Sequence, residues 1–245
     1  MTESQSREVT FKVDGRSLRG RQGESLLEAL RRYGYQVPSL CHHEAVSPYG
    51  ACRLCLVEVQ KGKRRKLTTS CNYPLMEGIE VFLDTEQVVS NRRVVLQLLL
   101  AQAPAAERVR QLAAEYGVND TPFEVEDPEN RCINCGLCAR VCKEVVGVEA
   151  IGFSGRGAGK RMVAPYDETA EDCIGCGACV FVCPTDCIGM SETGGIRTIE
   201  RWHRKLPLKT CSVCGRHFAP TFQLNKFAEW TGLPRGHFDK CPDCR

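Results

Sequence analysis

The chain of 245 residues contains 17 cysteines, gathered into groups with long stretches between them that contain none. No apolar run reaches the ~18 residues of a membrane span, and the N-terminal stretch has no apolar signal core, so we expect a cytoplasmic protein. Because cytoplasmic thiols stay reduced, the grouped cysteines predict metal sites rather than disulfides. The net charge of +3 is too small and too evenly spread to indicate nucleic-acid binding.

The motif C-x2-C-x2-C-x3-C occurs twice, as CINCGLCARVC (132–142) and CIGCGACVFVC (173–183), and the two copies share seven positions. In this bacterial-type pattern three cysteines wrap one 4Fe-4S cluster and the fourth binds the other cluster. We therefore expect a first 4Fe-4S cluster on Cys132, Cys135, Cys138 and Cys183, and a second on Cys142, Cys173, Cys176 and Cys179. Zinc or disulfides would not explain two such copies. Gly136, Gly175 and Gly177 suit loops whose backbone packs against inorganic sulfide.

An N-terminal group consists of Cys41, Cys52, Cys55 and Cys71, with the spacing C-x10-C-x2-C-x15-C. The plant-type 2Fe-2S pattern has a shorter first interval, C-x4-C. Because each iron of a 2Fe-2S centre needs only two thiolates, a longer first loop is tolerable. The group therefore predicts a 2Fe-2S cluster, and a zinc site built on the Cys52/Cys55 pair is the alternative.

The segments around these groups predict an α+β chain. Strands are expected over 8–14, 55–60 and 79–83, with a helix over 26–33 capped by Ser25. This order indicates a β-grasp 2Fe-2S ferredoxin domain over residues 1–84. A helix over 88–116, broken at Pro104, would fill a helical spacer (85–122), followed by the dicluster 4Fe-4S ferredoxin domain (123–200) and a tail (201–245).

The tail contains two C-x2-C pairs, Cys211/Cys214 and Cys241/Cys244, which are typical of a zinc ribbon with a closed four-sulfur site. Because the segment is too short to form a sufficient hydrophobic core, we expect the metal to stabilise its fold. A third 4Fe-4S cluster is the alternative. Between the pairs we expect a helix over 222–233 with Phe222, Phe227 and Trp230 packed inward, and His217 and His237 on the surface, although either histidine would be able to replace one thiolate.

Residues 8–84 and 126–200 resemble the iron–sulfur subunit of respiratory complex I and its relatives: diaphorase and bifurcating-hydrogenase iron–sulfur subunits, iron-only hydrogenase N-termini and NAD-dependent formate dehydrogenases. The resemblance rests on PSLCHHEAVSPYGACRLCLVEV with Cys71, on CINCGLCARVCKEVVGVEAIGF and on CIGCGACVFVCPTDCI. Members often carry a further 4Fe-4S cluster held by one His and three Cys. Ala103 stands where that histidine is expected, so we expect this cluster to be absent.

The cysteine motifs and the resemblance together predict an electron-relay subunit with one 2Fe-2S cluster and two 4Fe-4S clusters, and the tail cysteines add one zinc ion. Its implied partners are a flavin-bearing NAD(P)H-oxidising subunit, a thioredoxin-like 2Fe-2S subunit, and a hydrogenase or formate dehydrogenase. NiFe hydrogenase is preferred, because no iron-only hydrogenase domain follows in the sequence; electron bifurcation with ferredoxin is a further hypothesis. One-electron centres are suited to link a two-electron flavin to another redox site. The sequence itself contains no dinucleotide-binding motif. A free multi-cluster ferredoxin and an iron–sulfur redox sensor are the alternatives.

Four other features are given ordinary interpretations. Cys187 is interpreted as a small buried residue beside a cluster, with a reactive redox thiol as the alternative. His42 and His43 are expected to be exposed, since four cysteines are available and a Rieske centre is not needed. The basic run 61–66 indicates a solvated hairpin tip, or else a docking site for an acidic partner or ferredoxin. The run 155–161 (GRGAGKR) lacks the phosphate-loop spacing.

Overall fold

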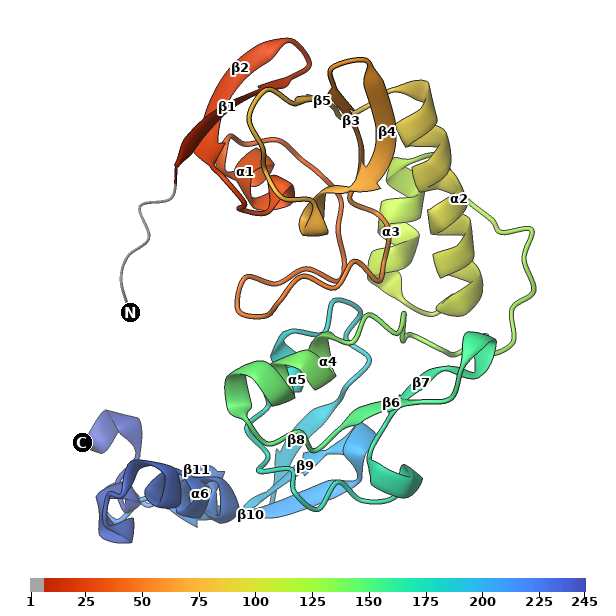
Figure 1. Ribbon diagram of the computed structural model, residues 1–245. Helices are drawn as coiled ribbons and strands as arrows, with labels where there is room; N and C mark the ends of the chain where they lie inside the picture. The colour runs from red at the N-terminus through yellow and green to blue at the C-terminus, as the bar shows by residue number, and fades with distance from the viewer. Residues whose placement is uncertain (1–6) are drawn as a thin grey trace. The chain divides into compact units, whose positions relative to one another are not determined.

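A five-stranded sheet organises the N-terminal unit of the computed structural model, which extends to Cys135 (Figure 1). The strands are β1 (Glu8–Val13), β2 (Arg16–Arg21), β3 (Leu56–Lys61), β4 (Arg64–Thr69) and β5 (Glu80–Phe82). Their order is β2-β1-β5-β3-β4, with β1 parallel to β5 and the other neighbours antiparallel. The structure describes residues 7–245; the first six, part of the N-terminal stretch in which no signal core was expected, lie outside the described residues.

Buried and exposed residues alternate along β1, and this pattern explains how one face of the sheet forms a core. Val9, Phe11 and Val13 are buried while the residues between them are exposed, as expected of a strand with one face against a core. Helix α1 (Leu26–Arg32) packs its leucines into the same cluster.

The predicted strands and helix of this unit are confirmed, but the predicted side-chain cap of the helix is wrong. Ser25 precedes the helix without capping it, and its hydroxyl donates to the carbonyl of Cys71 at 3.0 Å.

Two helices follow the sheet, α2 (Glu86–Gln102) and α3 (Glu107–Glu115), and the predicted break at Pro104 is confirmed. Thr85 caps α2, because its hydroxyl oxygen accepts a hydrogen bond from the backbone N–H of Val88 at 3.2 Å. Across residues 7–245, no helix combines the length and the apolar character that a membrane crossing requires.

A buried arginine ties these helices to the sheet. Arg92 on α2 is 1% exposed, and its Nη2 donates to the carbonyl of Leu56 on β3 at 2.7 Å. Its Nη1 lies 3.0 Å from the carboxylate of Asp84 and 3.1 Å from the hydroxyl of Tyr116, just beyond α3. One guanidinium therefore joins the sheet to both helices of the pair.

The second unit, from Gly136, contains short helices and a four-stranded antiparallel sheet. Its elements are α4 (Leu137–Arg140) with a π-helical turn (Val141–Val146), β6 (Gly152–Ser154), β7 (Arg161–Val163), α5 (Ala178–Phe181), β8 (Met190–Thr193), β9 (Ile196–Ile199), β10 (Arg204–Thr210), β11 (His217–Pro220) and α6 (Thr221–Thr231). The sheet order is β11-β10-β9-β8. The N-terminal half of β10 pairs with β9 and its C-terminal half with β11, so β10 carries the chain from the dicluster segment into the tail.

Helix α6 forms where the tail helix was predicted, but it packs differently. Its buried side chains are Leu224 and Ala228, and Phe227 is partly buried against them. Trp230 is 51% exposed and contacts Phe227 with a ring-centre distance of 5.8 Å. The expectation that Trp230 packs inward is therefore wrong, because it lies in the last turn of the helix, beyond the face that the tail covers.

We expect Arg92→Leu to lower the free energy of unfolding by about 2 kcal/mol, because the buried carbonyl of Leu56 and the hydroxyl of Tyr116 lose their donor. Arg108→Ala, at an exposed position of α3, is the matched control and is expected to change little. Urea unfolding of anaerobically prepared protein, followed by circular dichroism, measures both. Equal midpoints for the two variants would show that the buried guanidinium makes no net contribution.

Candidate metal centres

The N-terminal cysteine group is buried between α1, β3 and the turn after β4. Cys41, Cys52 and Cys55 come from the long loop that leads into β3, and Cys71 from the turn Ser70–Asn72; all four are at most 3% exposed. Ser70 fixes the turn, since its hydroxyl and its backbone N–H both donate to the carbonyl of Cys55, at 2.9 and 2.8 Å. Residues separated by up to 30 positions are thus held in one buried place.

The four thiols of this group form two contacting pairs. Cys41 and Cys52 interact through their side chains, and the backbone N–H of Cys52 also donates to the sulfur of Cys41 at 3.4 Å. Cys55 and Cys71 form the other pair; the hydrogen bond from the Cys71 thiol lowers the pKa of Cys55 to about 7. The same bond, together with burial, raises the pKa of Cys71. A 2Fe-2S centre takes two thiolates at each of its two irons, and the two pairs of thiols correspond to this requirement.

The two histidines after Cys41 are not exposed, contrary to the prediction. The side chain of His42 is 5% exposed, and its Nε2 lies 3.4 Å from Glu28 on α1. Burial and the nearby Arg31 lower the pKa of His42. His43 is half-buried, and its Nδ1 accepts from the backbone N–H of Ala45 at 3.2 Å. His42 therefore links the cysteine loop to α1, and His43 forms a hydrogen bond within that loop.

A cavity in the second unit is lined by four of the predicted ligands of the dicluster motif: Cys142, Cys173, Cys176 and Cys179. The rest of its wall is mainly apolar and includes Ile174, Ile199 and Trp202; the empty space measures about 380 Å³, part of it open to solvent. Burial raises the pKa of Cys142 and Cys173, and raises that of Cys179 to about 12. Such thiols hold their protons at neutral pH unless a metal displaces them. The set of four thiol donors fits an iron–sulfur cluster.

The other four dicluster cysteines are placed by the loops of the same repeat. Cys132 precedes the repeat's left-handed turn, and its backbone N–H donates to the side chain of Asn130 at 3.0 Å. Cys135 ends the first unit, Cys138 lies on α4 and Cys183 follows α5. Their assignment to one 4Fe-4S cluster stays a prediction.

Left-handed backbone explains the glycines of the repeat. Gly136 and Gly175 both have φ of +72°, and Asn134, which occupies the position of Gly175 in the first copy, has φ of +49°. A Cβ at Gly136 would lie 2.8 Å from the ring of Phe153, and one at Gly175 would lie 2.6 Å from Leu206. The left-handed turn favours glycine at both positions, and a Cβ would in addition press on the side chains of Phe153 and Leu206.

Cys187 lies directly beside a predicted ligand. Its sulfur is 3.5 Å from that of Cys183, and its backbone N–H donates to the Cys183 sulfur at 3.4 Å. The Cys187 thiol, followed by backbone donors from Thr185 and Cys187, lowers the pKa of Cys183 to about 5. The half-buried Cys187 thus contributes hydrogen bonds to its neighbour's sulfur.

The tail brings together Cys211, Cys214, Cys241 and Cys244, whose sulfur atoms all lie within 4.8 Å of one another. The sulfurs of Cys214 and Cys241 are 3.8 Å apart, about the edge of a tetrahedron around zinc with Zn–S bonds of ~2.3 Å. Backbone N–H groups of Cys214 and Cys241 lower the pKa of Cys211 to about 6, which favours its thiolate form. His217 and His237 are exposed, as predicted, and this four-sulfur group does not include them.

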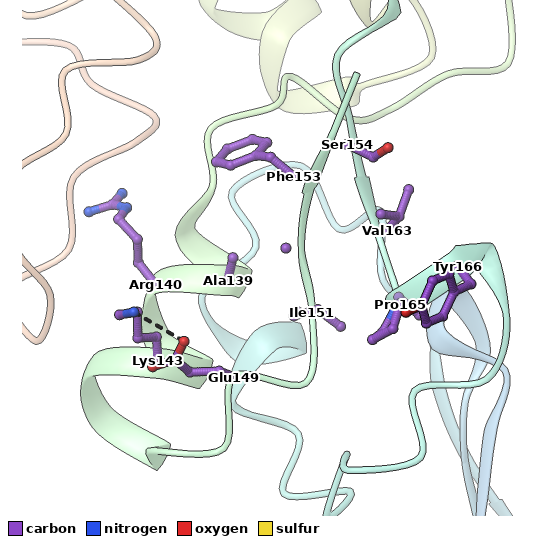
Figure 2. A pocket seen from close by; sticks show the side chains of 12 residues that line it. Ala139, Arg140, Lys143, Glu149, Ile151, Phe153, Ser154, Val163, Pro165 and Tyr166 are labelled. Atoms are coloured by element: carbon purple, nitrogen blue, oxygen red, sulfur yellow. Dashed lines mark hydrogen bonds and ion pairs between the residues drawn. The ribbon is translucent and has the colours of Figure 1, made fainter. Parts of the chain in front are cut away.

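The glycine-rich run 155–161 forms the turn between β6 and β7 and leads into a strand, so it lacks the helix N-terminus that binds phosphate in a P-loop. A groove lies between this hairpin and α4 (Figure 2). Figure 2 shows Phe153 and Tyr166 on its wall and the ion pair of Lys143 with Glu149, 3.0 Å long. None of the described residues that line it is a cysteine. The basic run 61–66 likewise spans the β3–β4 hairpin turn, as predicted.

Comparisons with known proteins match these two cysteine regions. Residues 6–86 match the family described as a 2Fe-2S iron-sulfur cluster binding domain, and residues 127–190 match the family described as a 4Fe-4S dicluster domain. The chain is 32% identical over 201 residues to NADPH-Fe(3+) oxidoreductase subunit alpha of Geobacter sulfurreducens, and 30% identical over 203 residues to an NADH-quinone oxidoreductase subunit of Rhizobium meliloti. Each alignment covers 72% of this chain and 23% of the relative.

Two further similarities extend this result. The NADH-ubiquinone oxidoreductase 75 kDa subunit of Reclinomonas americana is 34% identical over 172 residues, 61% of this chain and 25% of that protein. The chain thus spans about a quarter of the length of these curated relatives. A solved NAD+-reducing NiFe hydrogenase, in the H2-reduced state, contains a chain similar over 64% of this chain and 74% of its own, with 30% identity and a TM-score of 0.57.

We expect Cys241→Ser to release the metal held by the tail and to loosen its fold, because one of four sulfur ligands is lost. Ser212→Ala changes an exposed neighbour of Cys211 and is the matched control. Metal analysis and limited proteolysis after residue 210 measure the two effects. Full metal content and protease resistance in C241S would contradict a four-sulfur site in the tail.

Proposed function

Because the chain belongs to the family of iron–sulfur electron-transfer subunits that includes the 75 kDa subunit of NADH-ubiquinone oxidoreductase and a chain of NAD+-reducing NiFe hydrogenase, we propose that it relays single electrons within a multi-subunit oxidoreductase. The observation that carries this proposal is the apolar cavity onto which all four predicted ligands of one 4Fe-4S cluster converge. A wall of cysteines and apolar side chains suits electron storage and lacks an acid–base pair for substrate chemistry.

The proposed cofactors are one 2Fe-2S cluster, two 4Fe-4S clusters and one zinc ion. The ligands are Cys41, Cys52, Cys55 and Cys71 for the 2Fe-2S cluster, Cys132, Cys135, Cys138 and Cys183 for the first 4Fe-4S cluster, Cys142, Cys173, Cys176 and Cys179 for the second, and Cys211, Cys214, Cys241 and Cys244 for zinc. When bound, the clusters supply one-electron redox chemistry. The tail site is structural, since its four thiolates leave no position open for substrate.

The chain's own residues then have three tasks. Ser25 and Ser70 hold the turn of Cys71 against the loop of Cys55. Apolar side chains such as Ile174 and Ile199 limit the access of water to the second dicluster site. Backbone and side-chain donors around Cys183 stabilise its thiolate. Each task fixes the position or the charge of a sulfur ligand, which is how a protein adjusts a cluster.

The four segments expected from the sequence are proposed as the domains: a β-grasp domain (1–84), a helical spacer (85–122), a dicluster domain (123–200) and a zinc-ribbon tail (201–245). The mixed sheet with its central parallel pair β1–β5 and the packing of α1 support the first assignment. The sulfur group of the tail supports the last.

The proposed partners are a flavin-bearing NAD(P)H-oxidising subunit and a thioredoxin-like 2Fe-2S subunit on one side, and a catalytic subunit on the other, all in the cytoplasm. NiFe hydrogenase is the first choice, supported by the similarity to a chain of an NAD+-reducing NiFe hydrogenase over 74% of that chain's length. A formate dehydrogenase is the second choice. Bifurcation with ferredoxin is an elaboration of the same role.

Two other classes of function remain as outcomes of the test. A free multi-cluster ferredoxin would carry the same clusters without a stable partner. A redox sensor would hold its clusters in exposed, labile sites, which the burial of the N-terminal cysteine group does not favour.

We expect anaerobic purification of the tagged chain from its own host to recover a flavin subunit together with hydrogenase or formate dehydrogenase chains, identified by mass spectrometry. The preparation should contain about ten irons and one zinc for each copy of the chain. Recovery of the chain alone, with its iron complete and fully reducible, would favour a free ferredoxin. About fourteen irons and no zinc would instead assign a third 4Fe-4S cluster to the tail.

A further inference from the structure

Trp202 reaches the second dicluster site from outside the cysteine repeat. It follows β9, in the turn that leads into β10, and is 1% exposed. Its indole lines the cavity of Cys142, Cys173, Cys176 and Cys179, and its Nε1–H donates to the sulfur of Cys179 at 3.4 Å. A buried indole N–H needs a hydrogen-bond partner, and the structure gives this one a predicted iron ligand.

Two arginines from the adjoining strands hold the same cysteine loop. Nη1 of Arg197 on β9 donates to the carbonyl of Gly175 at 2.8 Å, and Nε of Arg204 on β10 donates to the carbonyl of Cys173 at 3.0 Å. The backbone completes the contact, since the N–H of Ala170 donates to the carbonyl of Trp202 at 3.1 Å. The loop 173–179 is therefore fixed against the sheet, and the distance between Trp202 and the Cys179 sulfur is set by several bonds.

We propose that Trp202 is a positioning residue that raises the reduction potential of the cluster held by Cys142, Cys173, Cys176 and Cys179, through the hydrogen bond from its indole N–H to the Cys179 sulfur. Reduction adds one electron and hence negative charge to the cluster and its sulfurs. A donor aimed at one of those sulfurs stabilises the reduced form more than the oxidised form, and hydrogen bonds to sulfur are among the factors that set cluster potentials.

The repeat alone does not supply this interaction, because Trp202 lies 23 residues beyond Cys179, in the turn between β9 and β10. The proposal rests on the proposed function, since it takes the four cysteines as ligands of a cluster. It goes further in assigning a tuning role to a residue that is not a ligand.

The test is Trp202→Phe in the full chain, prepared anaerobically, because phenylalanine keeps an aromatic ring in the core and removes the donor. We expect unchanged iron content and a lower midpoint potential for one 4Fe-4S cluster in an EPR-monitored titration. At a fixed potential, we expect the ratio of reduced to oxidised cluster to fall by up to tenfold. For a one-electron couple, a tenfold change corresponds to a shift of the midpoint potential by about 59 mV. The other clusters should keep their potentials.

Trp230→Phe is the matched control, because the chain has two tryptophans and Trp230 is half-exposed at the end of α6. It should leave every potential unchanged. Full iron content in W202F with unchanged potentials would overturn the proposal. A chain without iron–sulfur clusters in any variant would overturn the proposed function instead, so the two failures are distinguishable.

A second measurement covers the case in which W202F loses iron. The unaltered protein is labelled with 15N-indole tryptophan, and pulsed EPR is expected to find an indole-nitrogen coupling in the signal of one 4Fe-4S cluster. The coupling should persist in W230F, which leaves Trp202 as the one labelled indole. Absence of the coupling from the reduced 4Fe-4S signals would overturn the hydrogen bond and with it the proposal.

Discussion

Each proposed cluster needs thiolate ligands from separate segments, placed where little water can enter, and this requirement explains much of the fold. Burial makes thiolates costly, as the pKa of about 12 at Cys179 indicates. A metal that replaces the protons removes this cost, so metal binding and folding are coupled. The surrounding elements therefore serve to fix loops: Ser70 and Ser25 hold the turn of Cys71, and left-handed residues such as Asn134 bend the dicluster loops.

The two copies of the cysteine repeat are alike in sequence but differ in their surroundings. Cys142 and Cys183 occupy the same place in the repeat, yet burial raises the pKa of Cys142, whereas the nearby Cys187 and Thr185 donors lower that of Cys183. Since hydrogen bonds and exposure adjust cluster potentials, we expect the two proposed 4Fe-4S clusters to differ in reduction potential. The difference in surroundings comes from the neighbours that each copy of the eleven-residue repeat contacts.

Sequence patterns predicted the features that depend on residues close together in the chain. The cysteine groups, the early strands and the helix break at Pro104 follow from short-range periodicity and from proline geometry. The failures concern side-chain surroundings: His42 is buried against Glu28, and Trp230 lies beyond the covered face of α6. The contacts of Arg92 with Leu56 and of Trp202 with Cys179 span 36 and 23 residues, and no local pattern encodes such pairs.

Strand β10 connects the second cysteine loop mechanically to the tail. It begins at Arg204, which binds the carbonyl of Cys173, and ends at Thr210, directly before Cys211 of the four-sulfur group. Because β10 pairs with β9 on one side and with β11 on the other, the tail does not reorient without breaking this pairing. A metal bound by the tail would therefore also stabilise the strand that supports Arg204 and the segment of Trp202. Metal in the tail is thus expected to reinforce the hydrogen bonds that hold the second cluster's loop.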